Sequence, residues 1–196
     1  MFTVLLALVA SSPAAPVVPA SPTGPVRLSH LPAQTRTDIE LRPPQDSEGI
    51  AVASRLVAPA PMDIQRISYR LVGGHADCDA GMAHTAMVWK ESNGDPQPVQ
   101  GFDVREVPDS AQRVVTLTFP QPIHLERGQA LVMGVELLRD GDLAMCMAAS
   151  SQAPSRPVGQ FLSLELGPAY QWQSFSTVGL AMTLDMVAAG VYSPLR

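Results

Sequence analysis

Residues 130–137 read Ala-Leu-Val-Met-Gly-Val-Glu-Leu, with a large apolar side chain at every second position. Successive side chains of a β-strand point to opposite faces of a sheet, so this period of two predicts a strand with one buried face. Apolar alternation also occurs at 64–71, 114–119 and 178–187. Further runs of strand length lie at 50–57, 85–89, 101–106, 143–148, 161–166 and 170–175.

Turn residues separate these runs. Asn93-Gly94-Asp95-Pro96 and Arg139-Asp140-Gly141-Asp142 carry the dipeptides that reverse the chain between paired strands. The best helical candidate, 120–128, is short and contains two prolines. The pattern predicts an all-β fold, an antiparallel β-sandwich or jelly roll of about ten short strands, with little or no helix outside a signal peptide.

The N-terminal residues are typical of a secretory signal peptide. Phe2–Ala10 is an apolar run, and small residues follow it up to Ala20, so we expect a signal peptide over 1–20. Five prolines punctuate 21–47, which predicts a linker or an arm laid along a sheet edge. The β-sandwich domain is expected over 48–190 and a C-terminal tail over 191–196. Without a second long apolar run, we expect no transmembrane segment.

Charge limits the classes of partner. The chain has 13 Lys plus Arg against 18 Asp plus Glu, a net charge of -5, and Lys90 is the only lysine. A nucleic-acid binder needs a basic face to neutralise phosphates, so this class is not expected. The oligomeric state does not follow from the sequence.

The two cysteines, Cys78 and Cys146, form an even pair in a chain expected to mature in an oxidising compartment. One disulfide is therefore predicted. The alternative is two buried free thiols that pack as small hydrophobic groups.

The segment 73–84 gathers ligand-type side chains, namely His75, Asp77, Asp79 and His84. Carboxylate and carbonyl oxygens suit calcium, so a periplasmic metal-binding protein that uses the 75–84 loop is one alternative function. The opposing interpretation is a surface loop whose aspartates cap turns. Copper is a second possible ion, because Cu(I) prefers sulfur ligands. The candidate copper ligands are Met82, His84, Met87, Met133, Met145, Cys146 and Met147.

An aromatic group near the C-terminus is the candidate ligand-binding site. Tyr170, Gln171, Trp172 and Gln173 combine rings that stack on sugars with amides that recognise hydroxyl groups. The opposing interpretation is that Trp172 fills the core.

Catalytic motifs are missing from the sequence, since it has neither a Gly-x-Ser-x-Gly elbow nor Ser-x-x-Lys. A hydrolase with dispersed carboxylates stays open as a second alternative, with Glu106, Glu126, Glu136, Glu165 and Asp185 as its candidate acids. We expect a secreted or periplasmic, non-catalytic β-sandwich module without a cofactor. Its role would be structural, or it would bind an extracellular glycan or protein partner.

Overall fold

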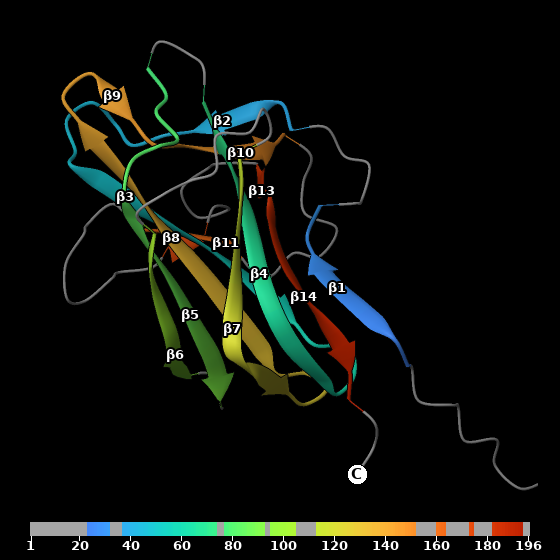
Figure 1. Cartoon of the computed structure of the whole chain (residues 1–196). Coiled ribbons are helices and arrows are strands. Elements are labelled where there is room, and N and C mark those ends of the chain that lie inside the picture. Colours follow the sequence, from blue (N-terminus) through green and yellow to red (C-terminus); the bar gives the residue numbers. More distant parts are fainter. Residues whose placement is uncertain are drawn as a thin grey trace, which may run out of the picture.

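The computed structural model describes residues 23–31, 37–73, 77–92, 95–104, 113–151, 160–163, 173–174 and 182–193. Its strands form two antiparallel sheets of seven strands each, and no helix occurs among the described residues, as the alternation predicted (Figure 1). The molecule is an all-β structure consistent with a β-sandwich.

The first sheet, called the β4 sheet, has the order β1-β14-β4-β10-β13, with β7 paired to β4 and β2 paired to β10. Its strands are β1 (Pro25–Ser29), β2 (Ile39–Leu41), β4 (Met62–Val72), β7 (Val114–Leu125), β10 (Cys146–Ser150), β13 (Thr183–Leu184) and β14 (Met186–Tyr192).

The second sheet, called the β8 sheet, has the order β12-β11-β3-β8-β5-β6, with β9 paired to β8. Its strands are β3 (Gly49–Val57), β5 (His84–Ser92), β6 (Asp95–Val104), β8 (Ala130–Asp140), β9 (Leu143–Ala144), β11 (Gln160–Ser163) and β12 (Gln173–Ser174).

The stretch 130–137 forms most of β8, as predicted. Its alternate side chains are buried: Leu131 is 0% exposed, Met133 1%, Val135 2% and Leu137 0%. β8 lies between β3 and β5 and pairs with both, so it is central in its sheet. The turn predicted at 139–142 joins β8 to β9, and Gly141 there adopts a φ of 58°, which glycine accepts without strain.

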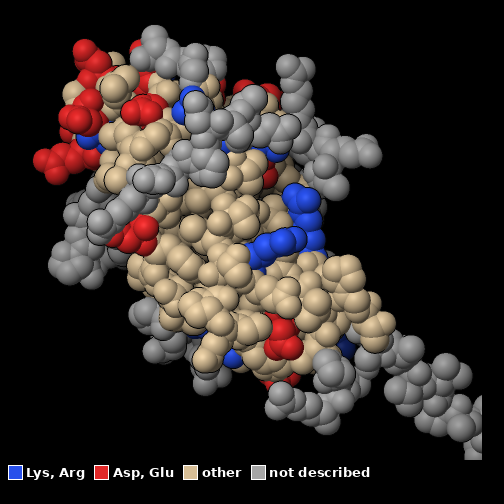
Figure 2. Space-filling model, in the orientation of Figure 1, with Lys and Arg blue, Asp and Glu red and all other residues tan. Residues whose placement is uncertain are grey.

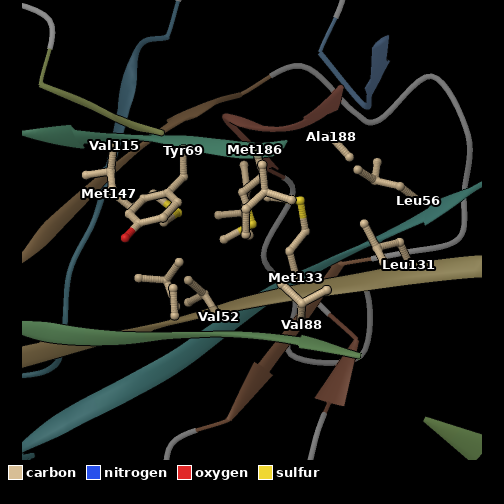
Figure 3. Packing of buried hydrophobic residues seen from close by; sticks show 14 of the residues in the cluster. Val52, Leu56, Tyr69, Val88, Val115, Leu131, Met133, Met147, Met186 and Ala188 are labelled. Atoms are coloured by element: carbon tan, nitrogen blue, oxygen red, sulfur yellow. The ribbon is translucent and has the colours of Figure 1, made fainter. Parts of the chain in front are cut away.

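The core lies between the two sheets. Figure 3 shows Val115, Tyr69 and Met186 of the β4 sheet pointing toward Val52 and Met133 of the β8 sheet. Burying each such side chain fully contributes about 1.5–3 kcal/mol by transfer out of water. Methionines fill several positions in this core because their unbranched side chains adapt to irregular gaps.

Two strands fall inside the proline-rich range 21–47. β1 pairs with β14 along its whole length, and β2 pairs with β10, so both belong to the β4 sheet. At the other end, β14 continues to Tyr192. The predicted signal peptide lies outside the described residues. No helix among the described residues is both long and apolar enough to cross a bilayer.

The predicted disulfide is confirmed. Cys78 and Cys146 are bonded with a Cα–Cα distance of 5.5 Å, and the bond joins the segment before β5 to β10. The bond spans a sequence separation of 68 residues, so it removes much of the conformational freedom of the unfolded chain.

Removing this disulfide should lower the free energy of unfolding by about 4 kcal/mol, the chain-entropy value for a loop of this length. The measurement is urea unfolding of the double variant Cys78→Ala/Cys146→Ala beside the oxidised wild type. Wild type with a reducing agent is the control for the loss of side-chain volume. An unchanged midpoint in both samples would contradict the expectation.

A close backbone approach occurs where β14 passes a bulge in β4. The register shifts between Ala189 and Gly190, opposite the step from Arg66 to Ile64. A Cβ atom on Gly190 would lie 2.0 Å from the backbone oxygen of Asp63. Backbone cannot rotate away as a side chain can, so this position requires glycine.

Gly190→Ala is therefore expected to lower the free energy of unfolding by about 1–3 kcal/mol, the usual cost of overpacking. Gly101→Ala is the matched control, since a Cβ there meets the flexible Met87 side chain at 3.0 Å. Thermal unfolding of both variants tests the difference. If Gly190→Ala is as stable as Gly101→Ala, the close approach is not rigid.

Candidate functional site

The predicted metal-binding loop is joined to the β8–β9 hairpin by backbone hydrogen bonds. The amide of Ala144 donates to the Asp77 carbonyl at 2.9 Å, and the amide of Asp79 donates to the Ala144 carbonyl at 2.9 Å. Cys78, between them, is bonded to Cys146. The segment 77–79 is thereby held in place from both sides.

Each described candidate ligand of this loop has a protein partner. Asp77 pairs with Arg42 at 3.4 Å, and Asp79 accepts the amide of Gly81 at 2.8 Å, as an aspartate that caps a turn does. His84 is buried and bonded to Tyr69. His75 lies outside the described residues. Within the described ranges, no three His, Cys, Asp or Glu side chains come together as a metal-ligand group.

Four of the sulfur side chains considered for copper occupy other roles. Cys146 is in the disulfide and so has no thiolate, while Met133, Met145 and Met147 are buried in the apolar interior. Binding of calcium or copper by this chain stays a prediction that the structure does not test.

Tyr69 and His84 form a polar link between the two sheets. The Tyr69 hydroxyl lies 2.6 Å from Nε2 of His84, and Nδ1 of His84 lies 2.9 Å from the Met82 carbonyl oxygen. A carbonyl can only accept, so Nδ1 carries the proton, and Nε2 accepts from the Tyr69 hydroxyl. Tyr69 is 1% exposed and His84 4%, so the link is closed to water.

Burial sets the protonation of both groups. It raises the pKa of Tyr69 above its usual range and lowers the pKa of His84, because each charged form would lose its hydration. The Met82 carbonyl and the charge of Glu136 oppose the lowering at His84 only in part. The pair is a neutral structural bridge, and His84 is not available as a metal ligand while it exists.

The predicted aromatic site lies mostly outside the described residues. Tyr170, Gln171 and Trp172 are not among them, and Gln173 forms part of β12, where its backbone is paired with Leu162. Binding of a ligand by these four residues stays a prediction.

A different tryptophan lies on the outer face of the β8 sheet. A Cβ on Gly134 would lie 2.8 Å from the ring of Trp89, so the ring rests on this glycine. Nearby, the guanidinium group of Arg55 makes two contacts with the carboxylate of Glu91, and Nη2 lies 2.8 Å from Oε1. Pairing lowers the pKa of Glu91 and raises that of Arg55. The charge of Arg55 on this face is therefore neutralised by Glu91.

The described acids considered for hydrolysis lie on different elements: Glu136 is in β8, Glu126 follows β7, and Asp185 lies between β13 and β14. Glu126 lies 3.1 Å from Nε2 of His124, whose Nδ1 lies 2.7 Å from Asp63. These two carboxylates raise the pKa of His124. Asp185 contacts Arg70, on another part of the β4 sheet. Glu106 and Glu165 lie outside the described residues, so the hydrolase alternative stays untested.

A hollow of about 720 Å³ lies at the end of the sandwich that carries the β8–β9 turn. Arg139, in its wall, donates to the carbonyl oxygens of Pro43 at 2.9 Å and Pro44 at 3.0 Å. Its charge thus holds the segment before β3 in place, which is a structural role.

The outer face of the β4 sheet carries exposed arginines. Arg27 of β1 and Arg66 of β4 both pair across β14 with Ala189, so they project from the same face. Neither guanidinium group has an ion pair or hydrogen bond to any other described residue. On the other side of β4, Thr116 and Thr118 of β7 stand opposite Ser68 and Arg66. Sequence reasoning missed this face, although the polar half of the 64–71 alternation contains Arg66.

Arg70 stands further along the same face. Its Nε lies 3.2 Å from Oδ2 of Asp185, yet this buried nitrogen makes no hydrogen bond to the described residues. Arg70 and Arg27 border a small hollow of about 70 Å³, together with Ser68, Val114, Asp185 and Val187. The face therefore combines free cations, hydroxyl groups and one small depression.

No protein-family model and no curated protein sequence matches the chain. Among solved structures, it is similar to the cysteine protease and lectin-like domains of Cwp84, a surface layer associated protein of Clostridium difficile, at 8% sequence identity and a TM-score of 0.49. The match covers 79% of this chain and 33% of that chain, so this chain spans about a third of that length. At this TM-score the likeness carries no argument about function.

The buried His84 predicts a pH dependence of stability. Its folded-state pKa is below the ordinary value of 6.5, so the unfolded chain takes up the proton first as the pH falls. The contribution of His84 to the free energy of unfolding should be complete above pH 6.5 and should decrease as the pH falls from there through the lowered pKa. His84→Gln, which keeps an acceptor for the Tyr69 hydroxyl, should reduce this decrease in urea unfolding at pH 7.5 and 5.

His124→Gln is the control with the opposite sign. The raised pKa of His124 stabilises the fold below pH 6.5, and this contribution is lost as the pH rises through the raised pKa. The variant should lose a few tenths of a kcal/mol at pH 5, since the group is exposed and solvent screens its ion pairs. An equal acid loss in wild type and His84→Gln would remove His84 as the cause.

Proposed function

We propose that this chain is a non-catalytic β-sandwich module that acts outside the cytoplasm and binds a glycan. The alternative ligand is the surface of a partner protein. The observation that carries the proposal is the outer face of the β4 sheet, where the unpaired arginines Arg27 and Arg66 stand beside the hydroxyl groups of Ser68, Thr116 and Thr118.

The disulfide supports a location outside the cytoplasm. Bonds such as Cys78–Cys146 persist in oxidising surroundings and are rare in the reducing cytosol. The apolar N-terminal run of the sequence is consistent with export. A secreted or periplasmic location is therefore part of the proposal.

The chemistry of the face suits sugars better than catalysis. Hydroxyl groups donate and accept hydrogen bonds, as sugar hydroxyl groups also do, and guanidinium groups donate several bonds from one rigid plane. Thr116 and Thr118 are exposed and two residues apart on one strand, so both hydroxyl-bearing side chains leave the same face. Such a row can contact successive groups along an extended ligand.

The test begins with a glycan array and a pull-down using the full chain. The double variant Thr116→Val/Thr118→Val removes two hydroxyl groups while it keeps the branched shape. We expect it to bind its glycan about thirtyfold more weakly, since it loses two neutral hydrogen bonds that contribute about 1 kcal/mol each. Its stability should be unchanged.

Thr85→Val is the matched control, because Thr85 lies on β5 in the other sheet. It should bind as wild type does. If neither the glycan array nor the pull-down finds a ligand, the proposed function is wrong. If a glycan binds but the double variant retains full affinity, the ligand uses another surface.

A further inference from the structure

The charges of this protein are unevenly distributed. Figure 2, in the orientation of Figure 1, shows acidic side chains gathered at the end that carries β9, and basic side chains grouped over the β4 sheet on the side of β14 and β1. The whole chain has a net charge of -5. A basic group on an acidic protein attracts anions to one place and repels them elsewhere.

Three arginines contribute to this group. Arg27, Arg66 and Arg70 lie on the outer face of the β4 sheet, and the one carboxylate that an ion pair places beside them is Asp185. Among the described residues, an ion pair matches Arg70 with Asp185, whereas Arg27 and Arg66 have no ion pair. On the opposite sheet, by contrast, Arg55 is matched by Glu91.

The hollow between Arg27 and Arg70 is built by three neighbouring strands. β1 supplies Arg27, β4 supplies Ser68 and Arg70, and β14 supplies Val187 between them. Val187 is 7% exposed, and its small side chain leaves the two longer arginines standing on either side. A group that enters this hollow meets a guanidinium group on each side and the Ser68 hydroxyl.

Unsatisfied donors also point to a ligand. The guanidinium group of Arg27 has no partner among the described residues, and the buried Nε of Arg70 contacts Asp185 without a hydrogen bond. A buried donor without a hydrogen-bond partner destabilises the fold. An anion in the hollow would accept hydrogen bonds from the terminal guanidinium nitrogens of both arginines, which bind carboxylate and sulfate well because their planar donors match two oxygens.

Size limits what enters. A volume of about 70 Å³ is far below the roughly 300 Å³ at which small-molecule pockets begin, so the hollow accepts a substituent and not a sugar ring. The rest of the ligand would lie on the open face outside. Arg27 and Arg66 are two strands apart, about 10 Å at the usual strand spacing, which suits charges on separate units of a polymer.

We propose that the outer face of the β4 sheet binds an acidic polysaccharide, with a carboxylate or sulfate group held between Arg27 and Arg70 and a second anionic group held by Arg66. This assignment rests on the proposed glycan-binding function and names its ligand class. The sandwich thus discriminates ligands by charge as well as by hydroxyl pattern.

The test is calorimetric titration of the full chain with polygalacturonate, dextran sulfate and neutral dextran. We expect both acidic polymers to bind, neutral dextran not to bind, and affinity to fall as salt is added, because each arginine contact is screened. The first two polymers separate carboxylate from sulfate recognition. Vesicles of anionic lipid show whether a membrane surface competes.

Variants locate the site. Arg27→Gln and Arg66→Gln should each weaken binding of the acidic polymer at least fivefold, and the double variant more than twentyfold. Arg127→Gln removes the same charge from an exposed turn between β7 and β8, away from the face, and should stay within twofold of wild type. Asp185→Asn removes the competing carboxylate and should strengthen binding. Urea unfolding verifies that each variant is folded.

The outcomes separate the two proposals. One result would support glycan binding but overturn the acidic ligand class. In that result neutral glycans bind, Thr116→Val/Thr118→Val weakens their binding, and Arg27→Gln leaves their binding unchanged. Equal losses in Arg27→Gln and Arg127→Gln would show a general charge effect and overturn the site. Binding of anionic vesicles but of neither acidic polymer would overturn it as well.

Discussion

β4 pairs with β14, β7 and β10, and its side chains Ile67, Tyr69 and Leu71 are buried against the opposite sheet. A shift of one residue would turn this apolar set outward, so its burial fixes the register of all three neighbouring strands. The same constraint sends Arg66, Ser68 and Arg70 to the outer face, because strand side chains alternate. The proposed binding face is thus the other half of the pattern that builds the core.

The 73–84 segment illustrates how chemistry-bearing residues become structural. Cys78 is bonded to β10, and His84 at the other end accepts a hydrogen bond from Tyr69 of the opposite sheet. Asp79 closes a turn on Gly81. A covalent bond and a buried neutral hydrogen bond hold this connection between the two sheets at both ends. Side chains that looked like a ligand set in sequence are dispersed among these contacts.

The two outer faces differ in how their cations are matched. On the β8 sheet, Arg55 is half-buried and makes a two-point contact with Glu91, so its charge is satisfied within the protein. On the β4 sheet, Arg27 and Arg66 are exposed. A satisfied pair contributes to local order, whereas unmatched cations on an acidic protein are available to a ligand. This asymmetry favours the β4 sheet as the binding face.

The sequence alone predicted the fold class, many of the strands and the disulfide, but it did not predict β1 and β2 as strands. Alternation at 130–137 and turn residues at 139–142 are local signals, and an even cysteine pair has a single possible bond. Which strands pair was decided by the tertiary structure, which brings β1 beside β14 and so places Arg27 near Arg70, residues far apart in the chain. The sequence contains Arg27 and Arg66 but does not show that they lack ion pairs. Ion pairing depends on which side chains of other strands come within reach. Binding sites on sheets are of this kind, because hydrogen bonds between strands, not neighbourhood along the chain, decide which side chains share a face.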